Sequence, residues 1–274
     1  MSGWEIAVVL GIVEGVTEFL PVSSTGHLII AGHLLGFIGE KASSFEVAIQ
    51  LGAILSVVFL YWRRFLALVP TGPRAFVSGA SNLTGWSGLW RIVLATVPAL
   101  SVGYLARHVI KDKLFTPEAV TSALVVGGVL ILIVERLTSR QRANTLDTLT
   151  FRQALGVGLF QILALWPGTS RAAATIVGGM LLGLDRKSAA EFSFLIAVPV
   201  LFAATGYELI KMRNQLAFED SLQLGIGFVV SFIVALVAVK GFVSFLEHGK
   251  LTPFAWYRIV VAPVFYYLTR GLSF

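Results

Sequence analysis

Six apolar stretches of helical length dominate this sequence and restrict it to a membrane setting. Crossing the hydrocarbon core takes about 20 apolar residues of α-helix, which satisfies its own backbone hydrogen bonds. The chain is 56% hydrophobic and 13% charged, whereas soluble domains are roughly 25% charged. The sequence therefore predicts an all-α polytopic membrane protein, a single membrane domain over residues 1–274. The predicted crossings are residues 44–62, 89–106, 118–136, 188–209, 221–246 and 253–270.

Two further apolar regions are interrupted by proline and divide into pieces too short to cross. Residues 3–20 and 24–37 flank Pro21, and a short-helix, break, short-helix pattern recurs over residues 151–182 around Pro167. Proline removes a backbone donor and ends or kinks a helix. We expect each region to form a re-entrant helical hairpin whose tip lies at membrane depth. Residues 65–88, between two crossings, are expected to form an irregular loop.

The two hairpins belong to an internal repeat offset by about 146 or 147 residues. Residues 21–24 (PVSS) correspond to residues 167–170 (PGTS), and residues 11–14 correspond to residues 158–161. Each half then holds one hairpin and three crossings, and an odd number of crossings inverts the second half. Inverted repeats with broken helices place a shared site near the midplane. The predicted repeats are residues 1–136 and 151–274.

The formal net charge of +6 does not indicate a nucleic-acid partner, because Lys and Arg collect in the cytoplasmic loops of membrane proteins. The larger basic set should be cytoplasmic, so the mouth of the first hairpin faces outward. That set is Arg63, Arg64, Arg74, Arg91, Arg136, Arg140, Arg142, Arg152, Arg186, Lys187, Lys240, Lys250 and Arg258. The opposite set is Lys41, Arg107, Lys111, Lys113, Lys211, Arg213 and Arg270.

A pair of carboxylates precedes the first break. Glu14 and Glu18 are four residues apart and share one helical face. A charge at membrane depth costs about 2.5–3.5 kcal/mol on insertion scales. A divalent cation, an arginine or protonation must therefore compensate the pair. The alternative reading is a structural pair tied to a neighbouring arginine.

Hydroxyls and an imidazole follow the same break. Ser23, Ser24 and Thr25 open the next helix, where a serine or threonine is an ordinary N-cap. His27 lies one turn after Ser24. A lone histidine is often only hydrogen-bonded core, but this one shares a short window with two carboxylates. That grouping favours catalysis.

The second break carries the matching cationic group. Thr169, Ser170 and Arg171 open a helix whose N-terminus attracts anions. The guanidinium adds a fork suited to phosphate oxygens, and Thr175 adds a hydroxyl one turn later. Arg171 could instead pair with Glu14 or Glu18, and both readings hold if the pair opens when phosphate binds.

These two stretches carry a family resemblance. EGVTEFLPVSSTGH, residues 14–27, resembles the first signature of the undecaprenyl-diphosphate phosphatases (the BacA/UppP family), and PGTSRAAAT, residues 167–175, is similar to the second. The likeness covers nearly the whole chain. Ala172 stands where the family usually has serine, which removes one hydroxyl from the second helix.

The resemblance implies an integral enzyme of the bacterial inner membrane. Such an enzyme hydrolyses undecaprenyl diphosphate to the monophosphate carrier of peptidoglycan synthesis and alters bacitracin sensitivity. It implies a divalent cation (Mg²⁺ or Ca²⁺), a site open to the periplasmic face, and membrane lipid as surroundings. Glycine-rich helix faces allow a homodimer. The residues it marks are Glu14, Glu18, Ser24, His27, Ser170, Arg171 and Thr175.

A mechanism follows as a hypothesis. Arg171 and the two helix starts, with Ser23, Thr25, Thr169, Ser170 and Thr175, bind the phosphate. Glu14 and Glu18 hold the cation, or one of them is a base. Ser24 is the preferred nucleophile with His27 passing the proton; His27 itself and a metal-bound water are the rivals. The alternative function is a lipid or small-solute transporter, since transporters share this architecture.

Overall fold

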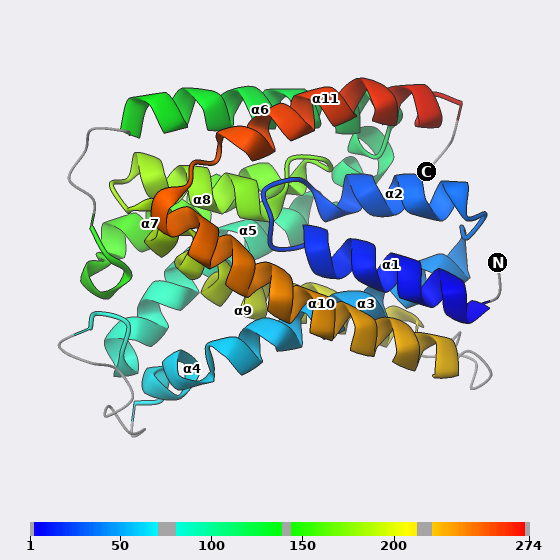
Figure 1. Ribbon diagram of the computed structural model, residues 1–274. Helices are drawn as coiled ribbons and strands as arrows, with labels where there is room; N and C mark the ends of the chain where they lie inside the picture. Colours follow the sequence, from blue (N-terminus) through cyan, green and yellow to red (C-terminus); the bar gives the residue numbers. More distant parts are fainter. Residues whose placement is uncertain (1–2, 71–80, 139–143, 213–220, 272–274) are drawn as a thin grey trace.

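Figure 1 presents the computed structural model of the chain, which describes residues 3–70, 81–138, 144–212 and 221–271. The predicted apolar segments are largely helical, which confirms the all-α class. In chain order the helices are α1 (Gly3–Thr17), α2 (Ser24–Leu34), α3 (Glu40–Leu60), α4 (Trp62–Leu68), α5 (Gly85–Leu114), α6 (Pro117–Thr138), α7 (Phe151–Gln161), α8 (Arg171–Leu181), α9 (Arg186–Met212), α10 (Ser221–His248) and α11 (Thr252–Thr269). Short 3₁₀ turns, η2 (Leu146–Thr148) and η3 (Ile162–Leu165), flank α7.

The long helices make this a multi-pass membrane protein. Within the described ranges, four helices are long and apolar enough to cross a bilayer: α5, α6, α9 and α10. A fifth crossing results if α3 and α4 form one span, which bends by 76° between them. Helix α11 has 18 residues and is not among these candidates. The crossing expected over residues 253–270 stays a prediction.

One predicted loop is partly wrong. Residues 65–88 were expected to be irregular, yet α4 extends to Leu68 and α5 begins at Gly85. The apolar sequence Phe65–Leu68 continues the helix because Ala67 is buried against the protein. Of the basic residues used for orientation, Arg74, Arg140, Arg142 and Arg213 lie outside the described residues.

Both proline breaks separate two short helices that pack against each other. Figure 1 shows α1 and α2 as neighbouring antiparallel helices joined by a turn, and α7 packs on α8 in the same way. Helix α1 packs on α10 from the other half, while α7 packs on α5. Glycine permits the first of these approaches, since a Cβ on Gly15 would lie 2.8 Å from the carbonyl oxygen of Ser231.

Several packing relationships of the first half recur in the second. Helix α3 packs on α10 and α9 on α5; α2 contacts α11 and α8 contacts α6; α3 packs on α9 and α6 on α11. Exchanging each helix for its sequence counterpart reproduces the first two of these relationships. The inverted repeat over residues 1–136 and 151–274 stays a prediction.

Two cations used to orient the chain are buried instead of facing a headgroup. Arg91 is 5% exposed and donates to the carbonyls of Leu149, Asn82 and Ser87. Arg258 is 0% exposed. Counting both as surface charges was therefore wrong, because their donors are used by backbone carbonyls inside the protein.

Candidate active site at the two helix breaks

Each break ends in a serine that caps the following helix. Ser23 Oγ accepts from the amide of Gly26, and Ser170 Oγ accepts from the amide of Ala173. Within the described part of the chain these two serines are the non-glycine residues with positive φ, at 76° and 71°. Such conformations cost about 1–3 kcal/mol and gather at functional sites. Matching strain at both tips points to the site.

The two tips meet through an ion pair. Arg171 Nη2 lies 3.3 Å from Glu18 Oε1, and their side chains are only 9% and 6% exposed. The other Glu18 oxygen accepts from Ser24 Oγ at 2.7 Å. One carboxylate thus contacts both the cation of the second hairpin and a hydroxyl of the first.

Arg171 also contacts Ser193 of α9 and Phe19 of the first break. Its Nη1 donates to the carbonyl of Ser193 at 3.0 Å, and its guanidinium carbon lies 5.5 Å from the ring centre of Phe19. Thr175 is fully buried and lies 2.6 Å from Ser193 Oγ. Thr175 therefore contacts Ser193, the same residue that binds Arg171. A hydrogen bond from Thr175 to phosphate stays a prediction.

Two polar groups at the site have no hydrogen-bond partner among the described residues. Glu14 is 1% exposed, and both of its carboxylate oxygens are unpaired. The Nε of Arg171 is also buried and unpaired. Unpaired buried polar atoms are costly. A cation next to Glu14 and an anion next to Arg171 would satisfy both.

Glu14 offers oxygens of the kind that bind magnesium, whereas both oxygens of Glu18 contact Arg171 and Ser24. Mg²⁺ is commonly held by one or two carboxylates together with substrate phosphates and water, and the free oxygens of Glu14 are suitable ligands. No group of three or more His, Cys, Asp or Glu side chains is arranged for a metal within the described ranges. Glu14 and Glu18 as cation ligands remain a prediction.

His27 lies in the first turn of α2 and bonds to a helix of the other half. Its Nδ1 lies 2.8 Å from the carbonyl oxygen of Ser23, which can only accept, so Nδ1 carries a proton. In the neutral ring Nε2 then accepts from the Tyr257 hydroxyl at 2.6 Å. The two rings also stack, with centroids 5.6 Å apart. His27 makes no hydrogen bond to Ser24 in this described part of the chain.

The remaining predicted hydroxyls occupy different environments. Thr25 is exposed in the first turn of α2, and Thr169 is half-buried in the second break. Ser170 Oγ also lies 3.5 Å from the carbonyl of Leu20, across the junction of the two tips. Ala172, which replaces the usual serine of the resemblance, is fully buried. None of these contacts tests phosphate binding.

Arg258 fastens both tips and was missed as a site residue. Its guanidinium donates to Pro21 O at 3.2 Å in the first break, and to Thr169 O at 2.8 Å and Gly168 O at 2.9 Å in the second. It also donates to two carbonyls of α6. Gly127 makes room for it, since a Cβ there would overlap the guanidinium. The sequence did hold a signal for this role: Arg258 stands within an apolar helix, and an ionisable residue in such a segment is functional by default.

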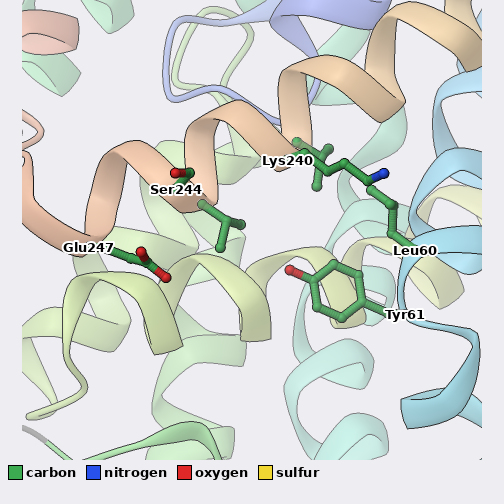
Figure 2. A pocket seen from close by; sticks show the side chains of 7 residues that line it. Leu60, Tyr61, Lys240, Ser244 and Glu247 are labelled. Atoms are coloured by element: carbon green, nitrogen blue, oxygen red, sulfur yellow. The ribbon is translucent and has the colours of Figure 1, made fainter.

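Two hollows lie elsewhere along α10. One, of about 280 Å³, is lined by Leu60, Tyr61, Lys240, Ser244 and Glu247 among others (Figure 2). None of the predicted site residues line it, and Glu247 is already paired with Lys187. The other, of about 460 Å³, lies against Leu20 in the first break.

Comparisons with known proteins identify the family. The family model described as bacitracin resistance protein BacA matches residues 7–264. The chain belongs to the BacA family. Family relatives named undecaprenyl-diphosphatase include the protein of Maridesulfovibrio salexigens, 55% identical over 264 residues that cover 96% of this chain and 98% of its own. The relatives from Solidesulfovibrio magneticus and Desulfovibrio desulfuricans are 55% and 51% identical over 261 residues, each covering 95% of this chain and 96% of the relative.

Proposed function

We propose that this protein is an undecaprenyl-diphosphatase, which hydrolyses undecaprenyl diphosphate to undecaprenyl phosphate and inorganic phosphate. BacA membership and the shared name of full-length relatives support the activity. The observation that carries it is the contact of Arg171 with Glu18 at the junction of the two breaks. A guanidinium, two helix starts and an acid pair there suit phosphoryl transfer, which depends on positioning and charge stabilisation.

The contacts of Glu18 favour one chemical route. Ser24 Oγ already donates to Glu18 Oε2, so the carboxylate can take the proton as Ser24 attacks the terminal phosphorus. Undecaprenyl phosphate leaves, and water then releases phosphate from the serine. Arg171 stabilises charge on the transferring oxygens. His27 is held by Ser23 and Tyr257, so in this arrangement its ring supports the start of α2 beside Ser24 and is not free to act as base or nucleophile.

A divalent cation bound at the site would neutralise charge on the phosphate oxygens. Glu14 and Glu18 are the side chains that would hold it, and the unpaired oxygens of Glu14 support that assignment. Arg171 and the capped starts of α2 and α8 bind the phosphate from the other side.

We further propose an inner-membrane location with the site open to the periplasmic face. Most Lys and Arg residues then lie on the cytoplasmic side, even when the buried Arg91 and Arg258 are left out of the comparison. The chain has no cysteine, so single-cysteine variants at Thr25 and Arg63 can be labelled in intact cells. A membrane-impermeant maleimide should reach Thr25→Cys but not Arg63→Cys; the reverse pattern would invert the orientation.

The activity is tested by incubating purified protein in detergent with undecaprenyl diphosphate and Mg²⁺ and measuring released phosphate. Trapped phosphoprotein should carry its label on Ser24, whereas label on His27 would assign the nucleophile there. The transporter alternative receives no support from the names of the relatives. Substrate movement across proteoliposomes without phosphate release would favour it.

A further inference from the structure

An apolar groove runs along α10 beside the first break. We call it the α10 groove; it is the hollow of about 460 Å³, and its wall includes Leu20, Val237, Gly241, Phe245 and Phe254. Pockets for small ligands are of this size. The side chains that line it are apolar throughout, so a phosphate or another charged group would gain no partner there.

One end of the groove adjoins the candidate site. Leu20 follows the ion-paired Glu18 by two residues, and its carbonyl lies 3.5 Å from Ser170 Oγ. Phe254 precedes Tyr257 by three residues on α11, so the two side chains lie on one helix face. Tyr257 in turn holds His27. The groove wall thus includes Leu20, a residue of the first break, and lies within a few residues of the groups that contact the site.

The glycine in the groove keeps space open. A Cβ on Gly241 would meet no heavy atom within 4 Å, whereas one on Gly11 would lie 2.9 Å from a backbone oxygen of α10. Gly11 thus serves close helix packing, and Gly241 does not. Val237 and Phe245 beside it are 69% and 41% exposed, so the groove faces the bilayer along its length.

We propose that the α10 groove holds the isoprenoid tail of the substrate next to the diphosphate. This inference rests on the proposed phosphatase function and adds the binding surface for the lipid. The lining runs from Ile233 to Phe245, roughly 18 Å at 1.5 Å per residue. That length accommodates the first few isoprene units, and the remainder of the tail lies in the bilayer. A prenyl chain is the occupant because it is covalently fixed to the group bound at the tips.

Gly241→Phe tests the proposal by filling the groove, and Gly225→Phe is its matched control. Gly225 lies on the same helix and does not line the groove, and a Cβ there would also meet no heavy atom within 4 Å. Phosphate release is measured with undecaprenyl, farnesyl and isopentenyl diphosphate. Gly241→Phe should raise KM for the two longer substrates at least about tenfold, since each lost CH₂ contact is worth about 0.8 kcal/mol. Isopentenyl diphosphate, whose tail barely enters the groove, should change by less than about twofold.

Two outcomes would overturn the groove assignment. Unchanged kinetics with undecaprenyl diphosphate would mean that the groove holds ordinary acyl chains. An equal loss on all three substrates, with a thermal unfolding temperature like that of the wild type, would also refute it, because the effect would not depend on the tail.

A second measurement does not depend on turnover. A farnesyl diphosphate analogue with a benzophenone at the tail end should cross-link to α10 in the wild type, and undecaprenyl diphosphate should compete. Cross-linking elsewhere would refute the groove. If the wild type cleaves none of the three diphosphates, the proposed function fails, while the cross-link still decides where a prenyl tail binds.

Discussion

The Tyr257 hydroxyl lies 2.6 Å from Nε2 of His27, although the two residues come from opposite ends of the chain. With Nδ1 bound to the Ser23 carbonyl, both nitrogens of the imidazole are occupied. The ring is therefore fixed in one orientation and one neutral tautomer.

Tyr257→Phe should reduce kcat/KM by about fivefold, because it removes a hydrogen bond worth about 1 kcal/mol and keeps the stacked ring. Tyr257→Ala removes both contacts and should cost more. Steady-state kinetics with undecaprenyl diphosphate provide the comparison. Identical activity of Tyr257→Phe and the wild type would show that this bond does not position His27.

Arg171→Ala should lower turnover by roughly 100- to 1,000-fold, the loss typical of one donor that stabilises transition-state charge. The variant should still insert into the membrane. Arg186→Ala is the matched control, because Arg186 also pairs with a glutamate, Glu135, away from the tips. Near-full turnover of Arg171→Ala would refute the phosphate-clamp role.

Glu14→Gln should abolish stabilisation by cations. A ligand that binds only the folded state raises the unfolding temperature, so Mg²⁺ should raise that of the wild type but not of the variant. Substrate turnover should also need more Mg²⁺, or cease. An equal thermal shift in both proteins would remove Glu14 from the cation site.

Arg258→Met should destabilise the protein by at least about 3 kcal/mol, because several buried carbonyls lose their donor. Folded protein recovered at low temperature should still lack turnover, since the two tips are no longer tied together. Arg91→Met removes the donor from other buried carbonyls, those of Leu149 and Asn82. It should lower the stability of the fold without abolishing turnover. A folded Arg258→Met with normal turnover would contradict the positioning role.

The ion pair of Arg64 with Asp147 predicts a pH dependence outside the membrane-spanning helices. The hydrogen bond from Arg64 lowers the pKa of Asp147 below its ordinary value of 3.8. The stabilisation is therefore present above about pH 3.8 and is lost as the pH falls through the lower pKa of the folded state. The side chains are 26% and 38% exposed, so the contribution is at most about 1 kcal/mol. Unfolding temperatures of the wild type and Asp147→Asn should differ at pH 7 and converge as the pH falls through the lowered pKa of Asp147.

The helices and both breaks could be predicted because their signals lie in residues that are adjacent in the sequence. Prolines at 21 and 167, with apolar runs on either side, were enough to find the short helices and the serines that cap them. The sequence did not predict that α4 continues to Leu68, because the burial of Ala67 that stabilises its end is a tertiary contact.

The sequence predicted the site residues that belong to its two motifs and missed those that lie outside them. Glu18 and Arg171 each stand in a recognisable motif, and their contact followed from joining the two hairpins. Tyr257 and Arg258 come from a third segment, where an aromatic beside an arginine resembles an ordinary interfacial anchor. Which carbonyls or ring nitrogens such side chains reach depends on helix packing, which local sequence does not specify.

Arg258 also sets an order for assembly. It lies in α11, which is synthesised after both breaks, yet it ties the turn of the first break to the turn of the second. Glu14, Glu18, Ser24 and Arg171 are therefore synthesised before the residue that ties their two turns together. We expect a chain truncated before α11 to contain these groups and yet lack turnover, because the two turns would not be tied together.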